Sequence, residues 1–342
     1  MSDDIHHECG IAALYRLEGT YDKCTAPDQG TDVVVLMPRM LLDMQTRGQL
    51  AAGFTTYNSE RAQLIDTFKD MGTVSEGFRM SRPEKYGSIL GEYAGSAAIG
   101  HTRYATTGAD DVRYAQPFER QHGRLWKWFA FAFNGTLSNY TALRDKLVAE
   151  RGYHFPLNTD TEIIMHCLAH GLRGDDIPDL RQLMESVSQD FDGAYSIVYL
   201  DALQRMFVAR DPLGIRPMSW AMQGGLFAAA SESVALTNLG FKEITTLAPG
   251  EMVIIERGNV RSERFSHSLS KARCFFEWVY FSNVASSFDG VSVYQTRAQA
   301  GHCLAAKEDQ NIDDSCIVVP VPDTAKATAD SFAYDTGIPC VE

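Results

Sequence analysis

Residues 128–133 read WFAFAF, and large and small apolar side chains alternate along them with a period of two. Because successive side chains of a strand point to opposite faces of a sheet, this alternation predicts a strand that packs differently on its two faces. Other short apolar runs indicate further strands, at residues 10–15, 51–54, 96–101, 194–200, 205–210, 226–230 and 251–256. Helices are expected at residues 34–45 and 138–150. The whole pattern predicts two layers of sheet flanked by helices.

A third helix is expected to open with a capping box, in which Thr159 caps the helix and Glu162 reaches back to it. The polar and charged residues 262–273 are the best candidate for a linker. Beyond them, residues 274–281 are rich in aromatic side chains. A helix over 292–305, a buried strand over 316–319 and a helix over about 325–335 are expected to follow. These elements are typical of the opening of a βα unit in a parallel sheet.

Composition excludes several classes of protein. A chain of 342 residues can form roughly two domains. Its net charge of −13 argues against a nucleic-acid surface and against anionic membranes. The longest apolar runs are too short to cross a bilayer. The first eight residues lack the basic and apolar regions of a signal peptide, so we expect a cytoplasmic protein.

Seven cysteines form an odd set without CxxC spacing, which argues against a disulfide framework or a zinc ribbon. His166 and His170 lie four residues apart without an HExxH pattern, and two histidines on one helix face are the simpler interpretation. Cys9 is different because it lies so close to the start of the chain. If residues 1–8 are removed, its own α-amine becomes a base beside the thiol, and no partner histidine is needed.

Asn134 and Gly135 follow the alternating strand. A side-chain amide and a backbone N–H at adjacent residues can both donate to one developing oxyanion. The simpler interpretation is an ordinary Asn-Gly turn, which is a common sequence.

Arg103 lies just past the end of a predicted strand, and Asp160 lies at a predicted helix start. A guanidinium suits the bidentate capture of an α-carboxylate, and a carboxylate can accept from an α-ammonium. Taken singly, each is explained by a surface ion pair or a helix N-terminal charge. Their occurrence together with Cys9 and Asn134-Gly135 favours a site that holds an amino acid by its head group.

Several strings then make a family resemblance specific. The chain resembles the glutamine phosphoribosylpyrophosphate amidotransferases, which are class II glutamine amidotransferases. The resemblance rests on ten strings in order along nearly the whole chain: ECGIAALY (8–15), RGQLAAGF (47–54), GHTRYATTG (100–108), AQPF (115–118), FNGTLSNY (133–140), TDTEII (159–164), ARDPLGIRPM (209–218), ASESVAL (230–236), LAPGEMV (247–253) and FEWVYFSNVASSFDGVSVYQTRA (276–298).

The resemblance implies an α+β fold, a four-layer αββα sandwich of the N-terminal-nucleophile hydrolase type, followed by the truncated start of an α/β type I phosphoribosyltransferase domain. It implies a propeptide at 1–8, a glutaminase domain at 9–261, and a linker with an incomplete transferase domain at 262–342. The implied roles are a Cys9 nucleophile that forms a glutamyl thioester, an oxyanion hole at Asn134 and Gly135, and a glutamine site with Arg103, Thr106 and Asp160.

In the family, ammonia passes to phosphoribosyl pyrophosphate in the first step of purine synthesis. The acidic pair and the Thr-Gly-rich loop of the transferase site do not occur here, so we interpret the sequence as a fragment. We expect no cofactor or metal in this chain, although Mg²⁺ is expected for the full transferase domain. An iron–sulfur cluster is unsupported because Cys274 matches only the first of four ligands.

The family suggests a homo-oligomer that binds glutamine. Two alternatives remain open. The chain could serve another acceptor, such as fructose 6-phosphate or aspartate, or it could be an unprocessed, catalytically silent regulatory module.

Overall fold

The computed structural model describes residues 9–17, 32–104, 111–268, 270–310, 312–313 and 315–341. The predicted propeptide and Thr106 lie outside these residues. The chain divides into two compact units, of which the first ends at Arg273 and the second begins at Cys274.

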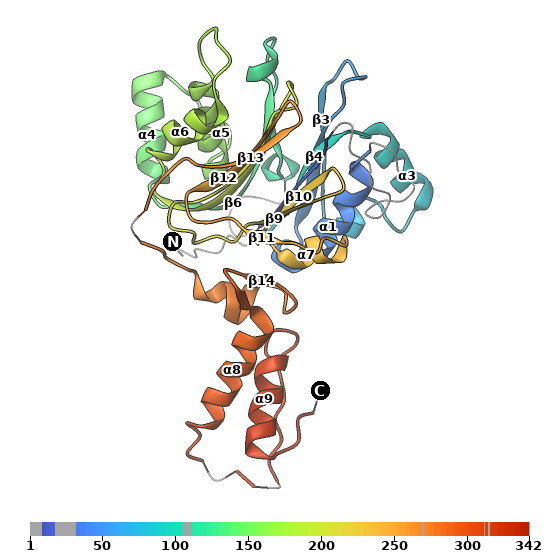
Figure 1. The fold of residues 1–342 in the computed structure, drawn as a ribbon, viewed down its shortest axis with the longest axis vertical. Coiled ribbons are helices and arrows are strands. Elements are labelled where there is room, and N and C mark those ends of the chain that lie inside the picture. Colours follow the sequence, from blue (N-terminus) through green and yellow to red (C-terminus); the bar gives the residue numbers. More distant parts are fainter. Residues whose placement is uncertain are drawn as a thin grey trace. The chain divides into compact units, whose positions relative to one another are not determined.

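Two antiparallel sheets form the centre of the first unit (Figure 1). The seven-stranded sheet has the order β11 (Thr245–Thr246), β9 (Ser219–Gln223), β10 (Leu226–Ala230), β1 (Gly10–Arg16), β4 (Ala97–Arg103), β2 (Ala51–Tyr57) and β3 (Ile65–Met71). The six-stranded sheet has the order β13 (Asn259–Arg264), β12 (Glu251–Glu256), β8 (Met206–Arg210), β7 (Gly193–Asp201), β6 (Phe129–Leu137) and β5 (Phe118–Arg120).

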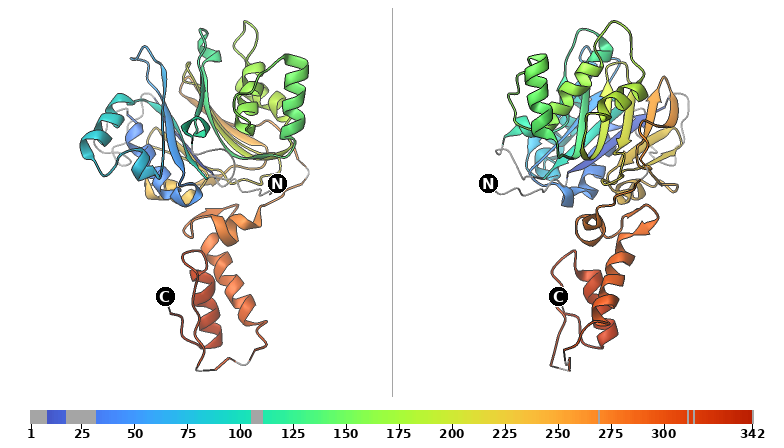
Figure 2. Two further views of the ribbon diagram at one scale, coloured as in Figure 1. Left: turned by 180° about the vertical axis from the view of Figure 1, so that it is seen from behind. Right: turned by 90° about the vertical axis from the view of Figure 1, so that its left-hand side faces the viewer.

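Helices cover the outer face of each sheet, as the left view of Figure 2 shows. The six-stranded sheet packs against α4 (Tyr140–Arg151), α5 (Asp160–Gly171) and α6 (Leu180–Ser188). The seven-stranded sheet packs against α1 (Met37–Asp43), α2 (Val74–Gly77), α3 (Pro83–Glu92) and α7 (Ser233–Asn238). A third apolar layer fills the space between the sheets. The expected four-layer αββα sandwich is therefore confirmed.

Strand β6 explains the alternating pattern of its sequence. Phe129, Phe131 and Phe133 belong to the layer under the helices, whereas Ala130 and Ala132 belong to the layer between the sheets. Small side chains on the inner face allow the two sheets to approach closely, and large ones fill the wider gap beneath the helices. The predicted strand, with two different faces, is confirmed.

Local expectations in the first unit need three corrections. Residues 34–36 form a 3₁₀ turn, and the α-helix proper is α1. Thr159 does cap α5 by accepting from the Glu162 N–H at 3.3 Å, but the Glu162 carboxylate accepts from the Leu157 N–H at 2.8 Å rather than from the cap residue. Strand β13 extends to Arg264, three residues into the expected linker.

The second unit contains a π-helical turn at Glu277–Phe281, a short hairpin of β14 (Ser287–Phe288) and β15 (Val291–Ser292), and two helices, α8 (Val293–Ala305) and α9 (Lys326–Thr336). The expected buried strand at 316–319 is wrong. Val318 makes only an isolated parallel bridge to Cys340, and Ile317 and Val319 are 59% and 63% exposed. A buried parallel strand needs paired neighbours and covered faces, and the described residues of this unit supply neither.

Candidate functional site

Cys9 stands directly before β1 and is 6% exposed. Its neighbour Gly10 donates its N–H to Thr102 Oγ1 at 3.2 Å, which fixes the start of β1 against β4. The Cys9 carbonyl accepts from Arg47 Nε at 3.4 Å. Both contacts hold the peptide group that follows Cys9, and so place this cysteine at the end of the seven-stranded sheet.

A buried ion pair supports this position. Arg47 donates from Nη1 to Glu232 Oε1 at 2.9 Å, and both side chains are fully buried. Two buried charges need each other because water is not available to solvate either one. The sequence analysis assigned no role to this pair, although both residues lie in strings that carry the family resemblance.

Asn134 and Gly135 belong to β6 rather than to a turn after it. Asn134 is fully buried, and its Nδ2 donates to Ser231 Oγ at 3.3 Å. At Gly135 a Cβ would lie 2.8 Å from the Tyr195 Cα and closer still to the Ala194 carbonyl oxygen. Only glycine fits at that position of the paired strands.

The two predicted head-group ligands come from different parts of the sandwich, Arg103 from the seven-stranded sheet and Asp160 from a helix on the six-stranded sheet. Arg103 ends β4 and is 6% exposed, and its guanidinium lies 5.4 Å from the centre of the Tyr114 ring. Asp160 opens α5, where its Oδ1 accepts from the Thr161 N–H at 2.8 Å and its Oδ2 from the Leu137 N–H at 3.4 Å. The second bond connects Asp160 to the strand that carries Asn134 and Gly135.

The pKa of the Cys9 thiol depends on both predicted head-group ligands. Burial raises the pKa of the thiol above its usual value, and it is the largest effect. The Tyr104 N–H, Arg216 and Arg103 each lower that pKa, whereas Asp160 raises it. Both predicted head-group ligands therefore act on the Cys9 sulfur. Because burial dominates, the thiol is protonated at neutral pH and needs a base to react.

Arg216 was not predicted, although it lies in the ARDPLGIRPM string. Its loop is held by two buried neighbours. Asp211 accepts from the Leu213, Ile215 and Arg216 N–H groups at 3.0–3.1 Å. Arg210 donates to the Gly214 and Arg216 carbonyls at 2.8 and 2.7 Å. This loop thereby brings a second guanidinium within electrostatic range of Cys9.

Gln116 is a further buried residue without a predicted role. Its side-chain Oε1 accepts from the Phe133 N–H at 2.7 Å, and its Nε2 donates to the Phe133 carbonyl at 3.3 Å. The amide thus pairs with both backbone groups of the residue before Asn134. Buried polar side chains that satisfy backbone groups carry no periodic signal, so pattern analysis does not find them.

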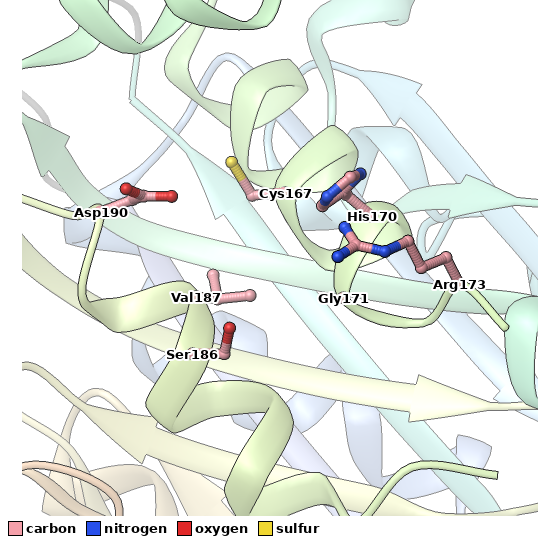
Figure 3. A pocket seen from close by; sticks show the side chains of 7 residues that line it. All are labelled: Cys167, His170, Gly171, Arg173, Ser186, Val187 and Asp190. Atoms are coloured by element: carbon pink, nitrogen blue, oxygen red, sulfur yellow. The ribbon is translucent and has the colours of Figure 1, made fainter. Parts of the chain in front are cut away.

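A pocket of about 310 Å³ opens between α5 and α6, and Cys9 is not among its lining residues (Figure 3). Its lining residues are Cys167, His170, Gly171, Arg173, Ser186, Val187 and Asp190. Those that belong to α5 lie near its C-terminal end, whereas Asp160 is its first residue. At a rise of about 1.5 Å per residue, the two ends of this helix are roughly 16 Å apart. His166, on the same helix, packs 4.6 Å from the Tyr153 ring, as a helix-face histidine.

Within the described ranges, no three His, Cys, Asp or Glu side chains come together in a way that could hold a metal ion. No chemical step is assigned to Mg²⁺ or to an iron–sulfur cluster. Of the helices in the same ranges, none combines the length and the apolar character needed to span a membrane.

Comparison with known proteins agrees with this geometry. Residues 101–238 match the family model of the glutamine amidotransferase domain. The amidophosphoribosyltransferase of Methanothermobacter thermautotrophicus is 34% identical over 338 residues, which are 98% of this chain and 65% of that protein. The Bacillus subtilis amidophosphoribosyltransferase is 33% identical over 302 residues, covering 87% of this chain and 59% of the relative.

A solved structure is similar over nearly the whole of this chain. The glutamine phosphoribosylpyrophosphate amidotransferase from B. subtilis, complexed with ADP and GMP, superposes with a TM-score of 0.81 at 29% identity, over 97% of this chain and 65% of that one. The chain thus spans less than two thirds of the length of each of these relatives. It belongs to the amidophosphoribosyltransferase family of glutamine amidotransferases.

Proposed function

We propose that this chain hydrolyses the side-chain amide of glutamine, with Cys9 as the nucleophile. The geometry that carries the proposal joins these residues: the Gly10 N–H, next to Cys9, donates to Thr102 Oγ1, next to Arg103, at 3.2 Å, and Asp160 accepts at 3.4 Å from the Leu137 N–H on the strand of Asn134 and Gly135. Arg103 and Asp160 also both act electrostatically on the Cys9 thiol. A cation and a carboxylate beside one thiol match the two charges of an amino acid head group.

In this proposal Arg103 binds the α-carboxylate of glutamine and Asp160 accepts from the α-ammonium. Thr106 completes the head-group site, as the family resemblance implies. Because these groups hold the head of the substrate, the side-chain amide extends toward Cys9. Asn134 Nδ2 and the Gly135 N–H donate to the oxygen of that amide when it becomes an oxyanion.

The raised thiol pKa requires a base, and the freed α-amine of Cys9 supplies one once residues 1–8 are removed. The sulfur attacks the amide carbon while the amine takes the thiol proton. The C–N bond then breaks, and the proton leaves with the nitrogen as ammonia. Water finally cleaves the thioester to give glutamate and the free thiol.

In a complete protein of this family the ammonia would serve phosphoribosylamine formation from phosphoribosyl pyrophosphate, and we extend the proposal to that role. The names of the relatives support it. Mg²⁺ would belong to that transferase step and not to glutamine hydrolysis. A cytoplasmic homo-oligomer is part of the same proposal, and the net charge of −13 supports the absence of nucleic-acid or membrane binding.

A glutaminase assay on the purified chain tests the proposal. The wild type should release glutamate and ammonia, and Cys9→Ala should lose that activity. Cys167→Ala is the matched control because Cys167 is also a buried thiol but lies in the α5–α6 pocket. Equal rates for wild type and Cys9→Ala would reject the function. Intact mass must show loss of residues 1–8 in the active form, and an unprocessed, inactive chain would favour the regulatory alternative.

A further inference from the structure

We propose that Ser231 is a positioning residue that holds the Asn134 side-chain amide in the orientation needed to donate to an oxyanion. This inference rests on the proposed glutamine hydrolysis. Ser231 follows β10 and is fully buried. It belongs to the ASESVAL string, for which the sequence analysis gave no chemical role.

Ser231 is fixed to the nucleophile strand by two hydrogen bonds to one residue. Its backbone N–H donates to the Ile11 carbonyl at 3.0 Å, and its Oγ accepts from the Ile11 N–H at 3.1 Å. Ile11 lies two residues after Cys9. The hydroxyl oxygen therefore has a defined position relative to the start of β1.

From that position the same oxygen accepts from Asn134 Nδ2 at 3.3 Å. Asn134 lies on the other sheet, so this contact joins the strand that follows the nucleophile to the strand that carries the proposed oxyanion donor. Both bonds to the Ser231 oxygen come from N–H groups, so the hydroxyl is the acceptor in each.

The acceptor role matters because an amide has two different edges. The NH₂ edge carries two donors: one binds Ser231, and the other is left for the substrate oxygen. The Asn134 Oδ1 is buried and has no partner among the described residues. Apart from the bond to Ser231, no contact of the Asn134 side chain within the described residues keeps this amide from rotating by half a turn. Such a rotation would present an acceptor to the developing oxyanion and repel it.

Loss of the hydroxyl should therefore slow the chemical step more than it weakens substrate binding. For Ser231→Ala we expect kcat for glutamine hydrolysis to fall about 10- to 100-fold, which is less than the 10²- to 10³-fold typical for loss of an oxyanion donor. KM should stay within about twofold because the head-group ligands are unchanged. Alkylation of Cys9 by iodoacetamide needs no oxyanion donor, and its rate should also stay within about twofold.

A double-mutant cycle separates this role from a merely structural one. In an Asn134→Ala background, Ser231→Ala should cause no further loss of kcat, because the group that it positions is already absent. Ser219→Ala is the matched control, since Ser219 is a fully buried serine on the neighbouring strand β9. It should retain wild-type kcat.

Three results would overturn the inference: wild-type kcat in Ser231→Ala, an equal loss in both backgrounds, or an equal loss in Ser219→Ala. If Ser231→Ala does not fold, Ser231→Cys takes its place, since it keeps the shape but offers a weak acceptor, and an intermediate loss is expected. An inactive wild type would instead reject the proposed function. An active wild type with an unaffected Ser231 variant would reject this inference alone.

Discussion

Replacing Gly135 by alanine tests the proposed oxyanion hole at its least tolerant position. The added Cβ would lie 2.8 Å from the Tyr195 Cα and 2.9 Å from the Ala194 carbonyl carbon, with the Ala194 oxygen nearer still. All three atoms are backbone of the adjacent strand β7, which pairs with β6 along its whole length. No side chain can rotate away, so the backbone at residue 135 must move.

The size of the effect follows from that movement. Ordinary contact of a Cβ with these atoms begins at about 3.4 Å, so the contact with the Ala194 oxygen requires a displacement of more than about 1 Å. Misplacement of about 1 Å at a reacting centre can cost 10²-fold in rate, and loss of one oxyanion donor costs about 2.7–4 kcal/mol. We expect kcat to fall by about 10²- to 10³-fold. The crowding should also lower the free energy of unfolding by about 1–3 kcal/mol.

The assay compares kcat and KM for glutamine hydrolysis and the urea unfolding of wild type and Gly135→Ala. Gly87→Ala is the control, because Gly87 lies inside helix α3 with no atom within 4 Å of a new Cβ. The control should keep wild-type kcat and gain about 0.5–1 kcal/mol of stability, as alanine does in helix interiors. A Gly135→Ala enzyme with kcat within threefold of wild type would refute the reasoning.

Two further predictions concern stability. Glu232→Gln should lower the free energy of unfolding by about 3–5 kcal/mol, because it removes the charge partner of the buried Arg47. Urea unfolding measures this loss, and a value below about 1 kcal/mol would contradict the prediction. His101 is fully buried, and burial, the largest cause, lowers its pKa to about 3. In the unfolded chain the histidine has a pKa of about 6.5 and binds a proton that the folded chain excludes. The contribution of neutral, buried His101 to the free energy of unfolding is therefore fully present above pH 6.5 and is lost as the pH falls toward 3. Between pH 6.5 and 5 the free energy of unfolding should fall by about 2 kcal/mol from this cause, and His101→Gln should lack that fall. Urea unfolding at several pH values measures it, and an equal dependence of the unfolding free energy on pH in wild type and His101→Gln would contradict the prediction.

The secondary structure was largely readable from local patterns. The expected strands at 226–230 and 251–256 coincide with β10 and β12, because their apolar residues are consecutive in the chain and bounded by turn residues. The strand expected at 316–319 failed for the opposite reason. Its apolar character is local, but a strand also needs partners, and Val318 finds only one bridging residue within the described part of its unit.

For the site, the sequence by itself determined the chemical types: a thiol near the start of the chain, an arginine, a carboxylate at a helix start, and an Asn-Gly pair. Their common location came from the tertiary structure, because Cys9 precedes β1 whereas Arg103, Asn134 and Asp160 lie on β4, β6 and α5. Only polar contacts between residues far apart in the sequence reveal Ser231, Gln116 and the Arg47–Glu232 pair. A buried polar side chain owes its role to atoms far away in the sequence, whereas a strand or helix depends first on its own neighbours.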